Sequence, residues 1–173
     1  MEDLPAIVPG EIVLLCTPTK EVMLMIMTRL ALAGPVCVLD TGNQFDAYQV
    51  ARLARRHVVE VGKVLSQIQV ARAFTCYQVV TLFEQLSCTA VPYIVFDLLG
   101  TFYDESVSLN ESHRLLGMVL GHLKRLRQTA PVVLSLYPPR QEERVGLVRA
   151  VTNLADHMFT WEAPTATTPA RLF

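Results

Sequence analysis

The feature that most constrains the fold is a series of short apolar runs that alternate with helix-length segments. The runs of strand length are residues 11–16, 36–40, 67–71, 93–97 and 131–137. Most of them are apolar at nearly every position, which indicates strands buried on both faces. Strands of this kind that alternate with helices predict a doubly wound, mainly parallel α/β sheet with helices on both faces.

The segments between these runs carry helix signals. Residues 22–33, 47–57, 77–86 and 142–154 are predicted as helices, and residues 157–162 alternate as an edge strand would. The clearest helix start is Ser108, which forms a capping-box pattern with Glu111 before a stripe of leucines and valines at helical spacing. We predict one domain over residues 1–163 and a loose tail over residues 164–173, which is rich in Thr, Ala and Pro.

The composition of the chain argues against a membrane-spanning segment and against general attraction to nucleic acid. Hydrophobic residues make up 51% of the 173 residues, but no apolar run approaches the ~18 residues that span a bilayer. The chain begins with acidic residues rather than a basic leader, so we expect a cytoplasmic protein without a membrane partner. The net charge of -1 gives no global attraction to nucleic acid.

The cysteines and histidines show no spacing typical of metal ligands. We therefore predict no metal site, and we expect Cys16, Cys37, Cys76 and Cys88 to be reduced and buried as small apolar residues.

Several short phrases, in this order along the chain, resemble the recombinase branch of the RecA family, the RadA-like proteins. Residues 40–45 (DTGNQF) are similar to its Asp-Thr-Glu-x-x-Phe turn, residues 68–74 (IQVARAF) to its I-x-x-A-R-A-F segment, and residues 93–97 (YIVFD) to its Walker B strand. The resemblance covers roughly residues 9–162. It implies a RecA-like core, a setting in DNA recombination or repair, and assembly as a homo-oligomer or as a hetero-oligomer with a RecA-like protein.

The residues that hydrolyse ATP in that family are changed here. A P-loop of the form G-x-x-x-x-G-K-[ST] wraps its backbone N–H groups around the phosphates. Residues 16–21 read CTPTKE at that place, so both glycines are missing and Pro18 removes one donor. Gly42 stands where the resemblance implies a glutamate that positions the attacking water. We therefore predict an inactive ATPase with no catalytic residue and no bound cofactor, which acts through protein association.

An alternative is a nucleotide-binding regulator or weak ATPase that uses an atypical phosphate loop with ATP and Mg²⁺. The remnants that would hold the nucleotide are Thr17, Thr19, Lys20 and Asp97. Asp97 ends the strand that resembles Walker B, and it is read either as a residual Mg²⁺ ligand or as a strand-end carboxylate satisfied by local hydrogen bonds.

Two basic groups are candidates for DNA contact. The resemblance implies a DNA-facing loop over residues 138–144, where Glu142 and Glu143 offset two arginines. The second group ends the helix that starts after Ser108, where cations also complement the helix dipole. The candidates are Arg140, Arg144, Lys124, Arg125 and Arg127.

Overall fold

The structure, a computed structural model, describes residues 7–57 and 60–161. Its strands are β1 (Ile12–Cys16), β2 (Val36–Asp40), β3 (Ile68–Arg72), β4 (Tyr93–Phe96), β5 (Val132–Leu136) and β6 (His157–Thr160). Its helices are α1 (Lys20–Ala33), α2 (Ala47–Ala54), α3 (Val61–Ser66), α4 (Cys76–Gln85), α5 (Leu109–Leu126) and α6 (Val145–Thr152), with 3-10 turns η1 (Gly100–Tyr103) and η2 (Glu142–Arg144). The tail predicted over residues 164–173 lies outside the described residues.

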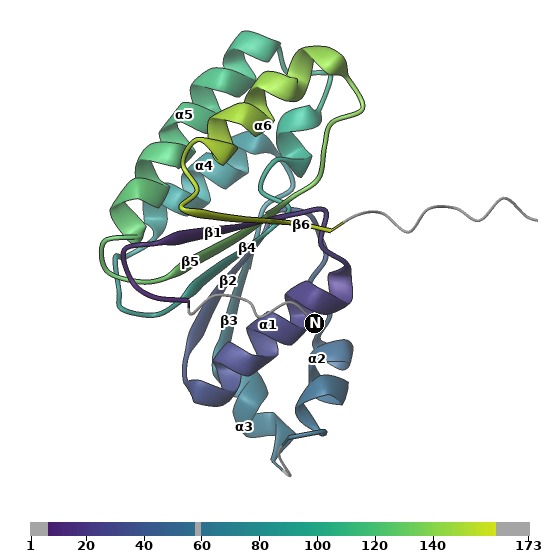
Figure 1. Ribbon diagram of the computed structural model, residues 1–173, viewed down its shortest axis with the longest axis vertical. Helices are drawn as coiled ribbons and strands as arrows, with labels where there is room; N and C mark the ends of the chain where they lie inside the picture. The colour runs from purple at the N-terminus through teal and green to yellow at the C-terminus, as the bar shows by residue number, and fades with distance from the viewer. Residues whose placement is uncertain (1–6, 58–59, 162–173) are drawn as a thin grey trace, which may run out of the picture.

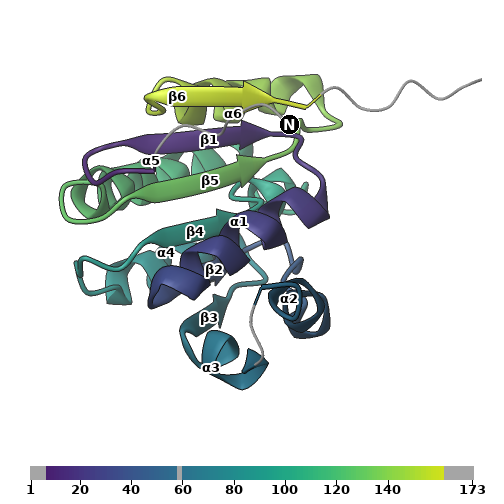
Figure 2. The same cartoon turned by 60° about the horizontal axis from the view of Figure 1, so that its bottom comes forward.

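All six strands are parallel and form one sheet in the order β3-β2-β4-β5-β1-β6 (Figure 2). Helices α1, α2 and α3 cover one face, and α4, α5 and α6 cover the other (Figure 1). The predicted doubly wound α/β fold is thus confirmed, and β6 is an edge strand as expected. The strand order differs from both the 3-2-1-4-5-6 order of dinucleotide-binding folds and the 2-1-3-4-5 order of flavodoxin-like folds.

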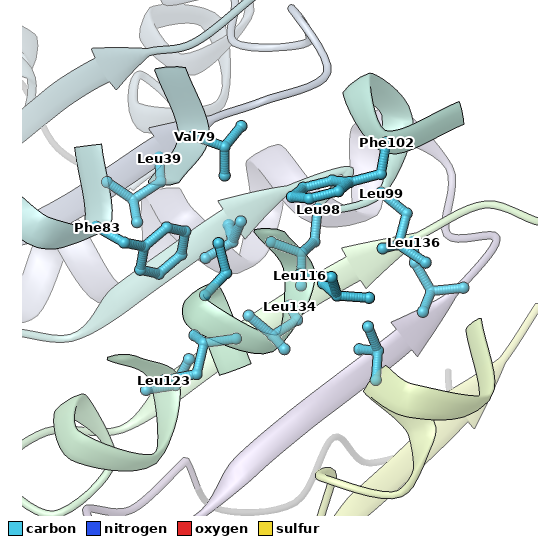
Figure 3. Close-up of a cluster of buried hydrophobic side chains, with 14 of the residues drawn as sticks. Leu39, Val79, Phe83, Leu98, Leu99, Phe102, Leu116, Leu123, Leu134 and Leu136 are labelled. Carbon is cyan, nitrogen blue, oxygen red and sulfur yellow. The ribbon is translucent and has the colours of Figure 1, made fainter. Parts of the chain in front are cut away.

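The core divides into two layers because the central strands are buried on both faces. On the α4–α6 side, Phe83, Phe102 and Leu134 are among the side chains that interlock between sheet and helices (Figure 3). On the α1–α3 side, α1 supplies buried Met23 and Met27 against the other face of the sheet. Apolar burial of this kind is the main stabilising contribution to a fold of this size.

The helix ends show which local signals operate. Ser108 caps α5, since its Oγ accepts a hydrogen bond from the Glu111 N–H at 3.2 Å. The Glu111 carboxylate binds the Arg114 guanidinium at 2.7 and 2.8 Å, which adds an ion pair beside the predicted cap. Thr19 caps α1 in the same way, because its Oγ1 accepts from the Val22 N–H at 3.3 Å.

Several predicted boundaries are wrong. The helix predicted over residues 47–57 ends at Ala54, and the one predicted over 142–154 divides into η2 and α6. Helix α3 and turn η1 were not predicted, since each is too short for a helical period to show. Cys88 is exposed and Cys16 and Cys37 are half-buried, so only Cys76 has the full burial expected of all four.

Among residues 7–57 and 60–161, no helix is both long enough and apolar enough to cross a membrane. The same residues contain no group of three or more His, Cys, Asp or Glu side chains arranged to hold a metal ion.

Candidate functional site

Because all the strands are parallel, their carboxyl ends lie at the same end of the sheet. The loops after β2 and β4 leave that end toward opposite faces of the sheet. The loop after β2 leads to α2 on one side, whereas the loop after β4 leads to α5 on the other (Figure 1). In open α/β sheets, ligands bind in the crevice that such a change of direction opens. The first place to search for a functional site is therefore the junction of β2 and β4.

Two hollows adjoin at this junction. The first, which we call the β2–β4 hollow, has a volume of about 300 Å³ and is lined from the loops after β2, β3 and β4. The second, the β4–β5 hollow, has a volume of about 500 Å³ and is lined from the loops after β4 and β5. Asp97 and Gly100 line both hollows, so Asp97 stands at the centre of this edge.

Backbone strain gathers at the same edge. In the described part of the chain, the non-glycine residues with positive φ are Thr17 (53°), Asn43 (53°) and Asp97 (51°). Each lies in the loop directly after a strand, namely β1, β2 and β4. A left-handed conformation costs a non-glycine residue about 1–2 kcal/mol, more for a β-branched one such as Thr17, and it persists only where surrounding contacts enforce it.

The backbone of Asp97 is held by such contacts. Its N–H donates to Ser135 Oγ at 2.9 Å, and its carbonyl accepts from Thr41 Oγ1 at 3.0 Å and from the Gly100 N–H at 3.1 Å. Thr41 and Ser135 are themselves buried. These bonds from β5 and from the loop after β2 hold the backbone of Asp97 in place at the end of β4.

The Asp97 carboxyl group is in an unfavourable place for a charge. Its pKa is raised from an ordinary aspartate value to about 6, chiefly by burial; a hydrogen bond from the Gly100 N–H lowers the pKa, and the Asp40 carboxylate adds a smaller increase. Its Oδ1 is buried and has no hydrogen-bond partner among the described residues. A strongly perturbed carboxyl group in a hollow is a candidate functional group.

Both carboxylate oxygens of Asp40, the acidic residue whose charge acts on Asp97, accept hydrogen bonds within the fold. Its Oδ1 accepts from the Gln44 N–H at 2.8 Å, and its Oδ2 accepts from the Phe45 N–H at 3.1 Å and from Arg72 Nε at 3.0 Å. It therefore fixes the loop after β2 and is not free to share a ligand with Asp97.

Glycines leave the room that the Asp97 side chain occupies. A Cβ atom placed on Gly42 would lie 2.5 Å from the Asp97 Cβ, and one placed on Gly100 would lie 2.7 Å from the Asp97 Oδ2. Gly42 stands where the resemblance implies a glutamate, and any side chain there would collide with Asp97 in this position. Glycine at position 42 and the placement of Asp97 thus belong together.

Two tyrosines complete the β4–β5 hollow. Tyr103 donates its hydroxyl to the Tyr137 carbonyl at 2.7 Å, and Tyr137 donates its own to the Pro18 carbonyl at 2.7 Å. Burial, with a smaller contribution from the Asp97 charge, raises the pKa of Tyr103, and burial likewise raises the pKa of Tyr137. Both hydroxyls remain neutral donors at physiological pH and join the loops after β1, β4 and β5.

The structure does not gather the residues that the sequence analysis assigned to nucleotide binding. Thr17 Oγ1 hydrogen-bonds the carbonyls of Cys16 and Trp161, and Thr19 is occupied as the cap of α1. Lys20 Nζ lies 3.4 Å from Asp46 Oδ2. Among the described residues, the lining of neither hollow includes any of these three, so the structure does not bring them together with Asp97.

ATP with Mg²⁺ therefore does not fit the turn at residues 17–20. The hydroxyls that would face phosphate are already bonded, Pro18 offers no N–H, and Lys20 is paired with Asp46. A phosphate cradle needs several free backbone donors around the anion. We derive no chemical step from this turn.

The basic candidates for DNA contact do not form one surface. Lys124 and Arg125 are exposed at the end of α5. They lie near the amino-terminal ends of the strands, whereas Arg140 follows the carboxyl end of β5, because α5 runs antiparallel to the strands. Arg127 donates hydrogen bonds to the Gly10 carbonyl at 2.8 Å and to Asp156 Oδ1 at 2.9 Å. It thus links the segment before β1 to the residue before β6.

Arg144 does not face solvent. It is only 5% exposed, and its guanidinium donates to the carbonyls of Phe102 and Val107 and to Ser112 Oγ. Because this guanidinium is buried and joins η1 and α5 to η2, it is not exposed for the DNA contact expected from the sequence.

The sequence pointed to Asp97 and Gly42 through the resemblance, but Tyr103, Tyr137 and Ser135 were not predicted as site residues. Ser135 and Tyr137 come at the carboxyl end of β5, and that position is the signal that would have identified them, whereas Tyr103 ends η1 and had no such signal.

Comparison with known proteins adds no relative: the chain matches no protein-family model and no curated protein.

Proposed function

We propose that this chain is a catalytically inactive RecA/RadA-like domain that acts by protein association, with an accessory role in DNA recombination or repair. The phrases at residues 40–45, 68–74 and 93–97 support the family, and the closed turn at residues 17–20 supports the loss of phosphate chemistry. The observation that carries the association is an open sheet edge with exposed apolar side chains beside it.

That edge is β3, which among the described strands pairs with β2 alone. Val70 in β3 and Phe74, two residues after its end, are 38% and 66% exposed; we call these two residues the β3 edge surface. An edge strand presents unpaired N–H and C=O groups, and large exposed apolar side chains beside them favour docking of another chain. The partner we propose is a second copy or a RecA-like protein.

We expect Val70→Lys to weaken this association at least about tenfold, because it places a charge on the docking edge. Sedimentation velocity over a concentration series, with the chain alone and mixed with an active RecA-like recombinase, measures the effect. Met158→Lys is the matched control, since Met158 is 57% exposed in β6 at the opposite edge of the sheet. A wild-type chain that stays monomeric and does not bind the recombinase contradicts the proposal, as does equal loss in both variants.

The nucleotide-binding alternative predicts a different response. A ligand that binds the folded state at a hundredfold excess over its Kd adds about 2.7 kcal/mol to its stability. Because we propose that the chain binds no nucleotide, we expect millimolar ATP or ADP with Mg²⁺ to leave the thermal midpoint unchanged. We also expect ATP hydrolysis to stay at background. A midpoint shift lost in Lys20→Ala, or a Mg²⁺-dependent turnover lost in Asp97→Ala, would establish the alternative.

A further inference from the structure

The β2–β4 hollow is built from three separate loops, and Phe74 is the one residue among its described lining that also belongs to the β3 edge surface. Strands β3, β2 and β4 lie side by side, and the loops that follow them meet at one edge (Figure 2). The volume of about 300 Å³ admits a small group and is too small for a nucleotide. The charge and polarity of the lining residues indicate which chemical class of ligand the hollow would bind.

The charge of this hollow is negative, and none of the described residues that line it is basic. Asp97 is the one ionisable side chain among the described residues that line it. Its Oδ1 has no hydrogen-bond partner, whereas the Asp40 carboxylate beyond it is already paired with Arg72. A partly buried carboxylate without a partner is costly, and an added cation would offset that cost.

Neighbouring groups suit a cation that also has an apolar or planar part. Phe74 lines the hollow and is 66% exposed, and aromatic rings attract ammonium and guanidinium groups within about 6 Å. Thr101 Oγ1 in the lining has no hydrogen-bond partner among the described residues, and the Asn43 side chain supplies an amide. These groups can accept hydrogen bonds from N–H donors.

A metal ion fits this lining poorly. Mg²⁺ is usually held by one or two carboxylates together with substrate phosphates, and Ca²⁺ takes six to eight oxygen ligands. The hollow offers a single carboxylate, and the described residues hold no cluster of three metal-ligating side chains. The β4–β5 hollow is less suited to a cation, because Arg140 lines it.

We propose that the β2–β4 hollow binds an organic cation, a guanidinium or primary ammonium group, carried by a small molecule or by an arginine or lysine side chain of a partner. The Asp97 carboxylate pairs with the cation, and the Phe74 ring covers it. The two sites share Phe74, which belongs to the β3 edge surface and also lines the hollow, but they can be tested separately, since Asp97 lies outside that surface and Val70 does not line the hollow.

The probe that tests the site is methylguanidinium, with methylurea as the uncharged molecule of the same shape. In amide NMR titrations of the full chain, we expect methylguanidinium to shift the signals of Gly42, Asn43, Phe74 and Thr101, and methylurea to leave them unchanged. Asp97→Asn keeps the shape and the left-handed preference at this position but removes the charge. We expect it to weaken binding at least about tenfold.

Two further variants separate the contributions. Phe74→Leu keeps the apolar volume and should weaken binding roughly two- to fivefold, as expected for loss of a cation–π contact at an exposed site. Arg140→Gln is the control, because Arg140 lines only the neighbouring hollow, and it should leave the affinity unchanged or slightly higher.

Acid should weaken the binding in a defined range. The ionisable groups around Asp97 are the carboxylate of Asp40, which Arg72 pairs, the hydroxyls of Tyr103 and Tyr137, which stay neutral, and Arg140, which lines the neighbouring β4–β5 hollow and stays charged. The pKa of Asp97 is raised to about 6, so protonation below that pH removes the negative charge. We expect the affinity to fall about tenfold per pH unit below 6 and to be constant above 7.

The source of the cation follows from a second probe, an acetylated and amidated arginine peptide. Binding at least tenfold tighter than that of methylguanidinium assigns the cation to a partner side chain, and equal or weaker binding assigns it to a small molecule. Equal shifts with methylurea, unchanged affinity in Asp97→Asn, or Asp97-dependent binding of Mg²⁺ alone that displaces methylguanidinium would each overturn the proposal. Because Val70→Lys leaves the hollow intact, failure of association and failure of this site are distinguishable.

Discussion

Arg144→Met is expected to lower the free energy of unfolding by about 3 kcal/mol. The guanidinium of Arg144 donates to the Phe102 carbonyl at 2.7 Å, the Val107 carbonyl at 2.8 Å and Ser112 Oγ at 3.1 Å. Methionine fills much of the same volume but donates nothing, so these acceptors would be left buried without partners. Buried acceptors that lose their donor retain the full cost of desolvation.

Urea unfolding monitored by circular dichroism measures this change. Arg140→Met is the matched control, since Arg140 is exposed four positions earlier in the chain and should change stability by less than about 0.5 kcal/mol. Arg144→Lys retains a cation but cannot reach all three acceptors, so its loss should be intermediate. A loss below about 1 kcal/mol in Arg144→Met would show that water or other donors satisfy these groups.

Asp97→Asn is expected to raise the free energy of unfolding at pH 8 by roughly 2–3 kcal/mol, an upper bound from the pKa difference. The pKa of Asp97 in the folded chain is about 6, against 3.8 for an ordinary aspartate. Between these values the folded state binds a proton that the unfolded state has released. The wild-type chain therefore loses stability as pH rises from about 4 to 6, and the asparagine variant does not.

The measurement is urea unfolding of both chains at pH 4 and pH 8, where the difference should be small at the lower pH and full at the higher one. Asp104→Asn is the control of opposite sign, because hydrogen bonds from Ser106 lower the pKa of Asp104 and its charge is favourable in the folded state. Greater stability of wild type than Asp97→Asn at pH 8 would mean that a cation already pairs with Asp97.

These two residues illustrate different uses of a buried ionisable group. Three hydrogen bonds from the Arg144 guanidinium to carbonyls and a hydroxyl fix η1 and α5 against η2, although its Nε has no partner among the described residues. Asp97 is held in a strained conformation with one oxygen unpaired. A residue whose cost is not compensated inside the fold is the better candidate for function, because a ligand can supply the missing contact.

The sequence by itself determined the fold class. Apolar runs such as residues 132–136 have no polar face, so they require cover on both sides, and the intervening helices supply it. The cap at Ser108 was predictable from the sequence because capping is an interaction between residues three positions apart. The short elements α3 and η1 were missed because six and four residues do not display a period.

Only the tertiary structure decided which candidates meet. Residues 40–45, 73–74 and 97–101 are far apart in the chain, and it is the placement of β2 between β3 and β4 that brings their loops to one hollow. Arg144 looked like Arg140 in the sequence, yet one is buried and the other exposed. Local pattern fixes which segments are strands and helices, whereas burial, charge pairing and the conformation of Asp97 depend on contacts between segments that only the packed sheet creates.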